Sequence, residues 1–276
     1  MLEHPGRFFQ EETRYRRETL QGRGLDWTTR PPSYKHYADA PLISLPAPAL
    51  PRADGGSSEG DAACGKGTPP DLLTCVARRR SVRVFATTPL TLVDLSRLLW
   101  ASAGLTASSA ASGARDFYRA APSAGALYPI ETYLVVNSAE DLEPGLYHYR
   151  VAGMDDLGRP TMEGSHSLEQ LRTGDLRAAV SASALDQSMC GRAGAVFLWT
   201  AVFARCEWKY RERAYRYIYL DAGHMAAQLS LAAVAQGLGS CPIAAFYDDE
   251  ADALLGVDGR SEAVIYMTAV GVPARR

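Results

Sequence analysis

A short segment of small residues and prolines, 122–131, most constrains how this chain can fold. It reads PSAGALYPIE and leads directly into the apolar run 132–136. Proline fixes its own φ and biases the residue before it toward extended backbone, while Gly125 and the alanines beside it leave the main chain open to close approach. The pattern predicts a shaped backbone surface that ends in a buried strand.

Two other segments share this character of a ligand-binding loop. Residues 78–83 read RRRSVR, and residues 237–243 read GLGSCPI. Guanidinium groups suit phosphate oxygens, and a turn of small residues exposes backbone N–H groups. The three segments together predict a site for an anionic, planar ligand. Each of these last two segments, taken alone, has a plainer alternative. Residues 78–83 could be a solvated basic surface, and residues 237–243 could be a tight helix-to-strand turn.

The composition limits the class of protein. The 276 residues are 47% apolar, which predicts a substantial core, and 29 basic against 31 acidic residues give a formal charge of −2. This balance gives no support for nucleic-acid binding. Five cysteines form no C-x-x-C pair, the N-terminus has no apolar signal core, and no apolar run is long enough to span a bilayer. We therefore expect a cytoplasmic protein with reduced thiols and no metal site.

The chain divides into three parts by composition. Residues 46–71 are rich in Pro, Gly, Ser and Ala and read as a flexible linker. Residues 1–45 form a polar N-terminal arm dotted with aromatic side chains, and residues 72–276 form the main domain. We leave the role of the arm open, with binding of a substrate leader as a guess.

Within the main domain, periodicity predicts both helices and strands. A helix begins after Thr91, a plausible N-cap, and carries Leu92, Leu95, Leu98 and Leu99 on one face. Helices are also expected at 168–184 and 213–236, and strands at 133–136, 145–151, 195–203 and 263–272. The elements lack a regular βαβ rhythm, so the fold class is α+β. A stripe of small residues on the second long helix predicts close helix–helix contact, with a dimer interface as the hypothesis: Ile218, Ala222, Met225, Leu229 and Ala232.

Three further patterns do not support a site. Residues 60–67 nearly spell a phosphate-binding loop but lack Ser or Thr after Lys66. Residues 237–242 fail as a dinucleotide fingerprint because Pro242 occupies the third glycine position. Asp221 and His224 lie one helical turn apart, and a structural hydrogen bond is favoured there over a metal or acid–base pair.

Taken in order, the segments resemble the FMN-dependent nitroreductase family. The residues that carry the resemblance are RRSVRVF at 79–85, the two loops described above, and the closing strand 264–272. The longer matches PSAGALYPIE, WKYRERAYRYIYLDAGH at 208–224 and GLGSCPIAAF at 237–246 look like one branch, the SagB-type dehydrogenases or azoline oxidases. The arm at 9–15 looks like this branch more weakly. The resemblance implies a nitroreductase-like α+β fold with a mixed central sheet flanked by helices. It also implies an intertwined homodimer with FMN at each subunit interface.

The resemblance also implies which residues hold the cofactor. Arg79, Arg80, Ser81 and Arg83 would bind the ribityl-phosphate and the pyrimidine edge. Pro122, Ser123 and Ala124 would come from the partner subunit with Leu127 close by, and Pro242, Ile243, Ala244 and Ala245 would line the ring. Many relatives carry Glu–Gly where this chain has Ala244–Ala245, so a glutamate has no role here. Whether Arg275 or Arg276 contacts the phosphate stays open.

The catalytic candidates are Lys209 and Tyr210, because the azole-forming branch has a Lys–Tyr pair at this position. Those enzymes oxidise thiazoline or oxazoline rings of a peptide to azoles. A lysine desolvated near the flavin would have a depressed pKa and could take the proton, while the phenol could orient it. Without the resemblance, Lys209 would read as part of a charged surface run. The implied partners are a heterocyclised peptide substrate and a cyclodehydratase complex.

Two other functions fit the same sequence. The first is an NAD(P)H-dependent nitro or quinone reductase on the same fold. The second is a non-catalytic, flavin-bearing scaffold of a cyclodehydratase complex. The sequence does not identify the substrate or choose between thiazoline and oxazoline.

Overall fold

The computed structural model describes residues 4–18, 20, 22, 24–48, 70–108, 117–156, 159–163 and 165–274. Most of the predicted linker and the tract that resembles a phosphate-binding loop lie outside the described residues, as do Arg275 and Arg276.

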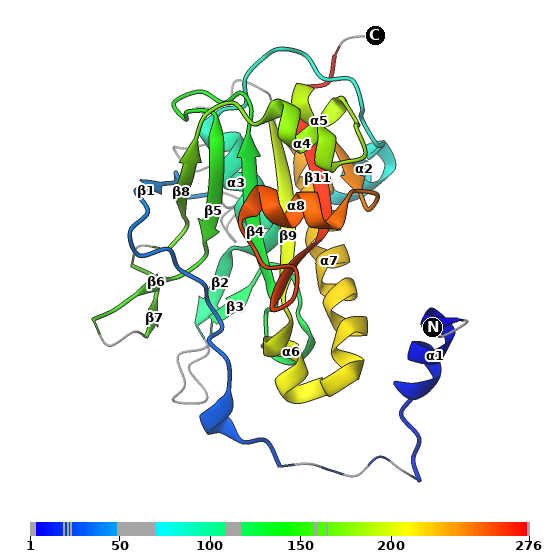
Figure 1. Ribbon diagram of the computed structural model, residues 1–276. Helices are drawn as coiled ribbons and strands as arrows, with labels where there is room; N and C mark the ends of the chain where they lie inside the picture. The colour runs from blue at the N-terminus through cyan, green and yellow to red at the C-terminus, as the bar shows by residue number, and fades with distance from the viewer. Residues whose placement is uncertain are drawn as a thin grey trace.

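A seven-stranded sheet forms the centre of the molecule (Figure 1). Every neighbouring pair of its strands is antiparallel, where a mixed sheet was expected. In spatial order the strands are β1 (Leu42–Ser44), β8 (Ser167–Thr173), β5 (Gly145–Arg150), β4 (Ile130–Val136), β9 (Ala195–Val202), β11 (Glu262–Gly271) and β10 (Gly239–Ile243). Two small hairpins join β2 (Leu105–Ser108) to β3 (Phe117–Arg119) and β6 (Gly153–Met154) to β7 (Pro160–Thr161).

Helices cover both faces of the sheet and confirm the α+β class. One face packs against α3 (Leu92–Ala103) and α7 (Ala214–Ala235). The other packs against α4 (Arg177–Ser183), α5 (Met189–Arg192) and α8 (Asp248–Leu255), which lie in front in Figure 1. The remaining helices are α1 (Pro5–Glu12), α2 (Leu72–Arg78) and α6 (Phe203–Tyr210). Successive residues of each central strand alternate between the two cores.

Local sequence signals placed α3 correctly. The Thr91 hydroxyl accepts a hydrogen bond from Asp94 N at 3.0 Å, and the Asp94 carboxylate accepts one from Thr91 N at 3.0 Å. This reciprocal capping box satisfies N–H groups that the first turn cannot pair internally. The predicted leucine face is confirmed, since Leu95, Leu98 and Leu99 are fully buried.

The helix expected over 168–184 is wrong. Strand β8 occupies Ser167–Thr173, and only Arg177–Ser183 is helical. The segment SLEQLRT is rich in helix-favouring residues, but its pairing with β5 on one side and β1 on the other overrides that propensity. Gly174, with φ +121°, ends the strand in a conformation that other residues rarely adopt.

Four of the five residues in the stripe on α7 face the core of their own chain, and Ala232 is half-buried. Ile218, Ala222, Met225 and Leu229 are at most 5% exposed and pack in the core that also contains α3. The predicted close helix–helix contact exists, but it lies within one chain. The exposed side of α7 instead carries Tyr219 and Leu220, at 57% and 58% exposure.

Residues of the N-terminal arm contact the main domain at several points. Residues 42–44 form the edge strand β1. Lys35 Nζ lies 2.5 Å from the Glu262 carboxylate, and Tyr37 N donates to the Glu169 carboxylate at 3.1 Å. Trp208 Nε1 donates to the carbonyl of Asp26 at 3.0 Å.

Candidate functional site

Two of the three segments singled out in the sequence lie side by side. Val82 N donates to the carbonyl of Ser240 at 2.9 Å, and Ser81 and Ser240 form a parallel bridge. A Cβ at Gly239 would lie 2.8 Å from the Val82 side chain, closer than real contacts allow. The glycine therefore permits the basic segment to approach the first residues of β10.

The described C-terminal end also runs beside the basic segment. Ala86 N donates to the carbonyl of Val272 at 2.8 Å, and Ala274 N donates to that of Val84 at 3.1 Å. Residue 274 therefore lies next to residues 83–84, at the end of the basic segment.

The arginines of the basic segment have few ion-pair or hydrogen-bond partners among the described residues. Within the described part of the chain, Arg79 and Arg83 show no ion pair or side-chain hydrogen bond, whereas Arg80 Nη1 donates to the carbonyls of Ala77 and Arg79 at 2.9 and 2.7 Å. Ser81 and Arg83 are exposed. Unpaired guanidinium groups next to an exposed hydroxyl suit an anion such as a phosphate. Of the β10 loop, Ile243 is buried, Pro242 is half-buried, and Ala244 and Ala245 are exposed.

The third segment, 122–128, is a loop with unusual backbone geometry. Gly125, Ala126 and Tyr128 have positive φ angles of 67°, 53° and 47°. Such a conformation is costly for residues other than glycine and persists only where the surroundings enforce it. Leu127 is buried, Ser123 and Ala124 are half-buried, and Pro122 is exposed.

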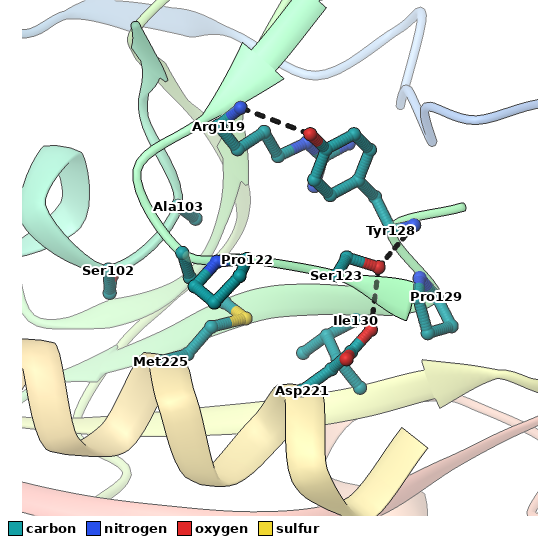
Figure 2. A pocket seen from close by; sticks show the side chains of 11 residues that line it. Ser102, Ala103, Arg119, Pro122, Ser123, Tyr128, Pro129, Ile130, Asp221 and Met225 are labelled. Carbon is teal, nitrogen blue, oxygen red and sulfur yellow. Dashed lines mark hydrogen bonds between the residues drawn. The ribbon is translucent and has the colours of Figure 1, made fainter. Parts of the chain in front are cut away.

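A buried carboxylate on α7 enforces this loop (Figure 2). Ser123 Oγ donates to Asp221 Oδ2 at 2.6 Å and accepts a hydrogen bond from Tyr128 N at 2.9 Å. Ala124 N donates to the other oxygen of Asp221 at 3.3 Å. Burial raises the pKa of Asp221, and these two hydrogen bonds oppose the rise. Asp221 is thus a structural anchor, and no group of three potential metal ligands occurs among the described residues.

Lys209 and Tyr210, at the end of α6, contact the same loop. A Cβ at Gly125 would lie 2.6 Å from Tyr210 Oη and 2.8 Å from Lys209 Nζ. Lys209 Nζ also lies 5.3 Å from the centroid of the Tyr210 ring. Burial raises the pKa of Tyr210, and the neighbouring Tyr217 adds to the rise, so its phenol stays protonated at neutral pH.

The candidate residues form two half-sites: residues 78–83 with 237–245, and the 122–128 loop with Lys209 and Tyr210. Within one chain the two half-sites lie far apart. Ser240 and Ala195, the first residue of β9, both pair with Val270 of β11, one from each side. Ser240 and Ala195 therefore lie at the same position along the strand direction. The carbonyl of Pro129, at the end of the loop, accepts a hydrogen bond from Val202, the last residue of β9. Strand β9 has eight residues, which rise about 3.3 Å each, so the halves are separated by roughly 23 Å along the strand. Figure 1 shows α2 and α6 at opposite ends of the sheet accordingly.

A buried cluster of charges behind the loop escaped the sequence analysis. Arg205 on α6 forms an ion pair with Glu131 at 2.6 Å. The His148 ring lies between Glu131 and Glu169, at 3.3 and 2.7 Å. Burial alone would raise the pKa of Glu131, but Arg205 and His148 lower it overall. Burial would likewise lower the pKa of His148, but the two carboxylates raise it. Glu131 and His148, which interrupt the buried strands β4 and β5, were the available signal.

Comparison with known proteins identifies the family. The family described as the nitroreductase family matches residues 76–272. The chain is 32% identical over 180 residues to a Methanocaldococcus jannaschii protein named as a candidate nitroreductase, an alignment that covers 65% of this chain and 81% of that one. It is 36% identical over 125 residues to the trifolitoxin-processing protein TfxB of Rhizobium leguminosarum bv. trifolii, covering 44% of this chain and 30% of that one.

Solved structures that resemble the fold include the following two. A candidate nitroreductase of Anabaena variabilis gives a TM-score of 0.70 at 28% identity over 96% of this chain, but this chain covers only 45% of that protein. The E. coli microcin synthetase McbBCD complex with truncated pro-MccB17 bound gives 0.56 at 22% identity, covering 82% of this chain and 78% of that one. The chain thus spans less than half the length of the Anabaena and Rhizobium proteins.

The chain belongs to the nitroreductase family, a family of oxidoreductases whose members generally bind flavin. In the part of the chain that the structure describes, no helix is both long and apolar enough to cross a bilayer.

Proposed function

We propose that this protein is an FMN-dependent dehydrogenase of the SagB type that oxidises azoline rings in a peptide to azoles. The observation that carries the proposal is the meeting of Lys209 and Tyr210 at Gly125. A lysine amine and a phenol contact a backbone turn with positive φ, and the hydrogen bond from Ser123 to the buried Asp221 carboxylate holds this strained turn in place. Strained backbone of this kind clusters at functional sites.

The residues present fit a flavin mononucleotide. Arg79, Arg83 and the Ser81 hydroxyl offer unpaired donors for a phosphate, and the glycine at 239 lets them lie against β10. Arg80, Pro242, Ile243, Ala244 and Ala245 would complete one half of the site. Pro122, Ser123, Ala124 and Leu127 would line the other. When bound, FMN would supply the two-electron oxidant that accepts a hydride from the substrate, with oxygen as the final acceptor.

The chain itself supplies proton handling. Aromatisation of an azoline removes one hydride and one proton from adjacent ring carbons. In its neutral amine form Lys209 would accept the proton at Nζ, whereas the raised pKa of Tyr210 keeps the phenol protonated and unsuited to act as a base. Tyr210 Oη can then donate a hydrogen bond that orients the ring or the lysine.

A homodimer would unite the two halves of the site. Because they are separated by roughly 23 Å along β9, one chain of the proposed dimer would offer its arginines and its Lys209 to different sites. A second copy could cover the exposed apolar side chains of α2 and α7. Leu72 and Leu73 on α2 are 65% and 78% exposed, and Tyr219 and Leu220 on α7 are 57% and 58% exposed.

The named relatives support a peptide as the substrate. One processes trifolitoxin, and a structural neighbour belongs to a microcin synthetase with its pro-peptide bound. We extend this chemistry to the present chain as part of the proposal, with a cyclodehydratase complex as the partner that supplies the azoline.

The test is mass spectrometry of a cyclised peptide incubated with the flavin-loaded protein in air. We expect a loss of about two mass units for each ring, the signature of a two-electron oxidation. Lys209→Met should abolish this loss without reducing flavin content, and Tyr210→Phe should slow it. A colourless protein that fails to take up FMN would refute the proposal. Flavin bleaching by NADPH without any peptide oxidation would favour the reductase instead.

A further inference from the structure

Arg205 lies one helical turn before Lys209 on α6. Residues four apart share a helix face, and both side chains reach the 122–128 loop: Lys209 at Gly125 and Arg205 at Tyr128. Arg205 is only 4% exposed, which is rare for a charged side chain unless its surroundings pair it fully.

Three different parts of the chain bind this guanidinium. Its Nη1 forms the ion pair with Glu131 of β4 and also donates to the carbonyl of Tyr128 in the loop, at 3.1 Å. Its Nε donates to the carbonyl of Pro32 in the N-terminal arm, at 2.7 Å. One side chain therefore connects α6, β4, the loop and the arm.

We propose that Arg205 is a positioning residue that holds Lys209 in register with the 122–128 loop. This inference rests on the proposed function, since it concerns the placement of its base. The planar guanidinium presents donors in a fixed fork, so it sets both the distance and the rotation of α6 relative to Tyr128. Catalytic rates are sensitive to such placement, and a shift of about 1 Å can cost on the order of a hundredfold.

A purely structural role would have a different signature. If Arg205 served only to balance the buried charge of Glu131, any cation there would suffice. Arg205→Lys keeps the charge but has a single ammonium that cannot span the three acceptors. We expect kcat to fall by about ten- to a hundredfold in this variant, with flavin content and the KM for the peptide unchanged. Flavin reduction by the peptide under anaerobic conditions should slow, while reoxidation by oxygen should not.

Arg177 offers a matched control. Its Nη2 donates to the carbonyl of Asn137 at 2.8 Å, just beyond the opposite end of β4. Arg177→Lys therefore makes the same chemical change at an arginine that also donates to a backbone carbonyl but does not belong to or contact α6. We expect wild-type turnover from this control. Wild-type kcat in Arg205→Lys would overturn the inference.

A second measurement needs neither flavin nor turnover. The chain has only three lysines, Lys35, Lys66 and Lys209, so reductive ¹³C-methylation gives three lysine NMR signals beside that of the α-amino group, and Lys209→Arg identifies one of them. The Tyr210 ring, 5.3 Å from Lys209 Nζ, should shift that signal. In the apoprotein of the double variant Glu131→Gln/Arg205→Met, which removes both partners of the Arg205–Glu131 ion pair together, the signal should move to the position of an exposed lysine. An unmoved signal would overturn the inference.

The two proposals can fail separately. If Lys209→Met oxidises the peptide normally, the proposed base is wrong, and the NMR signal still decides whether Arg205 positions Lys209. If Lys209→Met is inactive while Arg205→Lys is normal, the proposed base stands and the positioning role is refuted. If Arg205→Lys does not fold, the double variant gives the answer.

Discussion

The substitution Gly125→Ala tests the proposed site, because it adds one methyl group at the contact between Gly125 and the Lys209–Tyr210 pair. Gly125 has φ +67°, and a Cβ there would lie 2.6 Å from Tyr210 Oη and 2.8 Å from Lys209 Nζ. Ordinary contact begins at 3.4 Å, so in Gly125→Ala the phenol oxygen must retreat by about 0.8 Å and the ammonium by about 0.6 Å. We expect peptide oxidation to slow by about ten- to a hundredfold.

The same substitution also strains the backbone, and a control separates the two effects. An alanine at positive φ costs about 1–2 kcal/mol, which lowers Tm by a few degrees in a chain of this size. Gly256 follows α8 with φ +75° and has nothing within 4 Å of a built Cβ. Gly256→Ala should therefore lose similar stability and keep full turnover. Differential scanning calorimetry and the mass-loss assay, run on both variants, give the two readouts. Equal turnover in the two variants would refute the reasoning.

Two further substitutions test the buried polar groups. Ser123→Ala removes the donor to Asp221 and the acceptor for Tyr128 N, so urea unfolding should show a loss of about 1–3 kcal/mol; an unchanged midpoint would contradict the anchoring role. His148→Gln tests the charge held between Glu131 and Glu169, which raise the pKa of His148. The histidine contributes stability fully below its unfolded pKa of about 6.5 and loses it as pH rises through the higher folded value. The Tm difference between wild type and variant should shrink from pH 6 to pH 9.5, and a constant difference would count against the ion pairs.

The sequence located those features whose signals are local. The capping box of α3 occupies four consecutive residues, 91–94, and the apolar run 195–202 is long enough to identify a central strand. The loops at 122–128 and 237–243 were recognised because proline and glycine restrict or permit backbone conformations wherever they occur, and the segment 78–83 was recognised by its arginines.

The features that were missed depend on contacts between distant residues. Arg205 reaches Tyr128 and Pro32, which are 77 and 173 residues away in the chain. No periodicity within α6 indicates such partners. Likewise β8 is a strand only because β5 and β1 pair with it, and its composition alone favours a helix. For the same reason the hypothesis about α7 named the right contact type and the wrong partner, since a stripe of small residues does not reveal which helix it meets.

The separation of the two half-sites gives a test that depends on geometry alone. If each site takes Arg79 and Arg83 from one chain and Lys209 from the other, Lys209→Met and the double variant Arg79→Ala/Arg83→Ala should both be inactive as homodimers. Mixed and re-equilibrated, half of the dimers become heterodimers, and each heterodimer has one site built from two intact halves. Activity should then return to about a quarter of the wild-type value, as two-fold symmetry requires. If instead the whole site belonged to a single chain, every chain in the mixture would carry a defect and no activity would return.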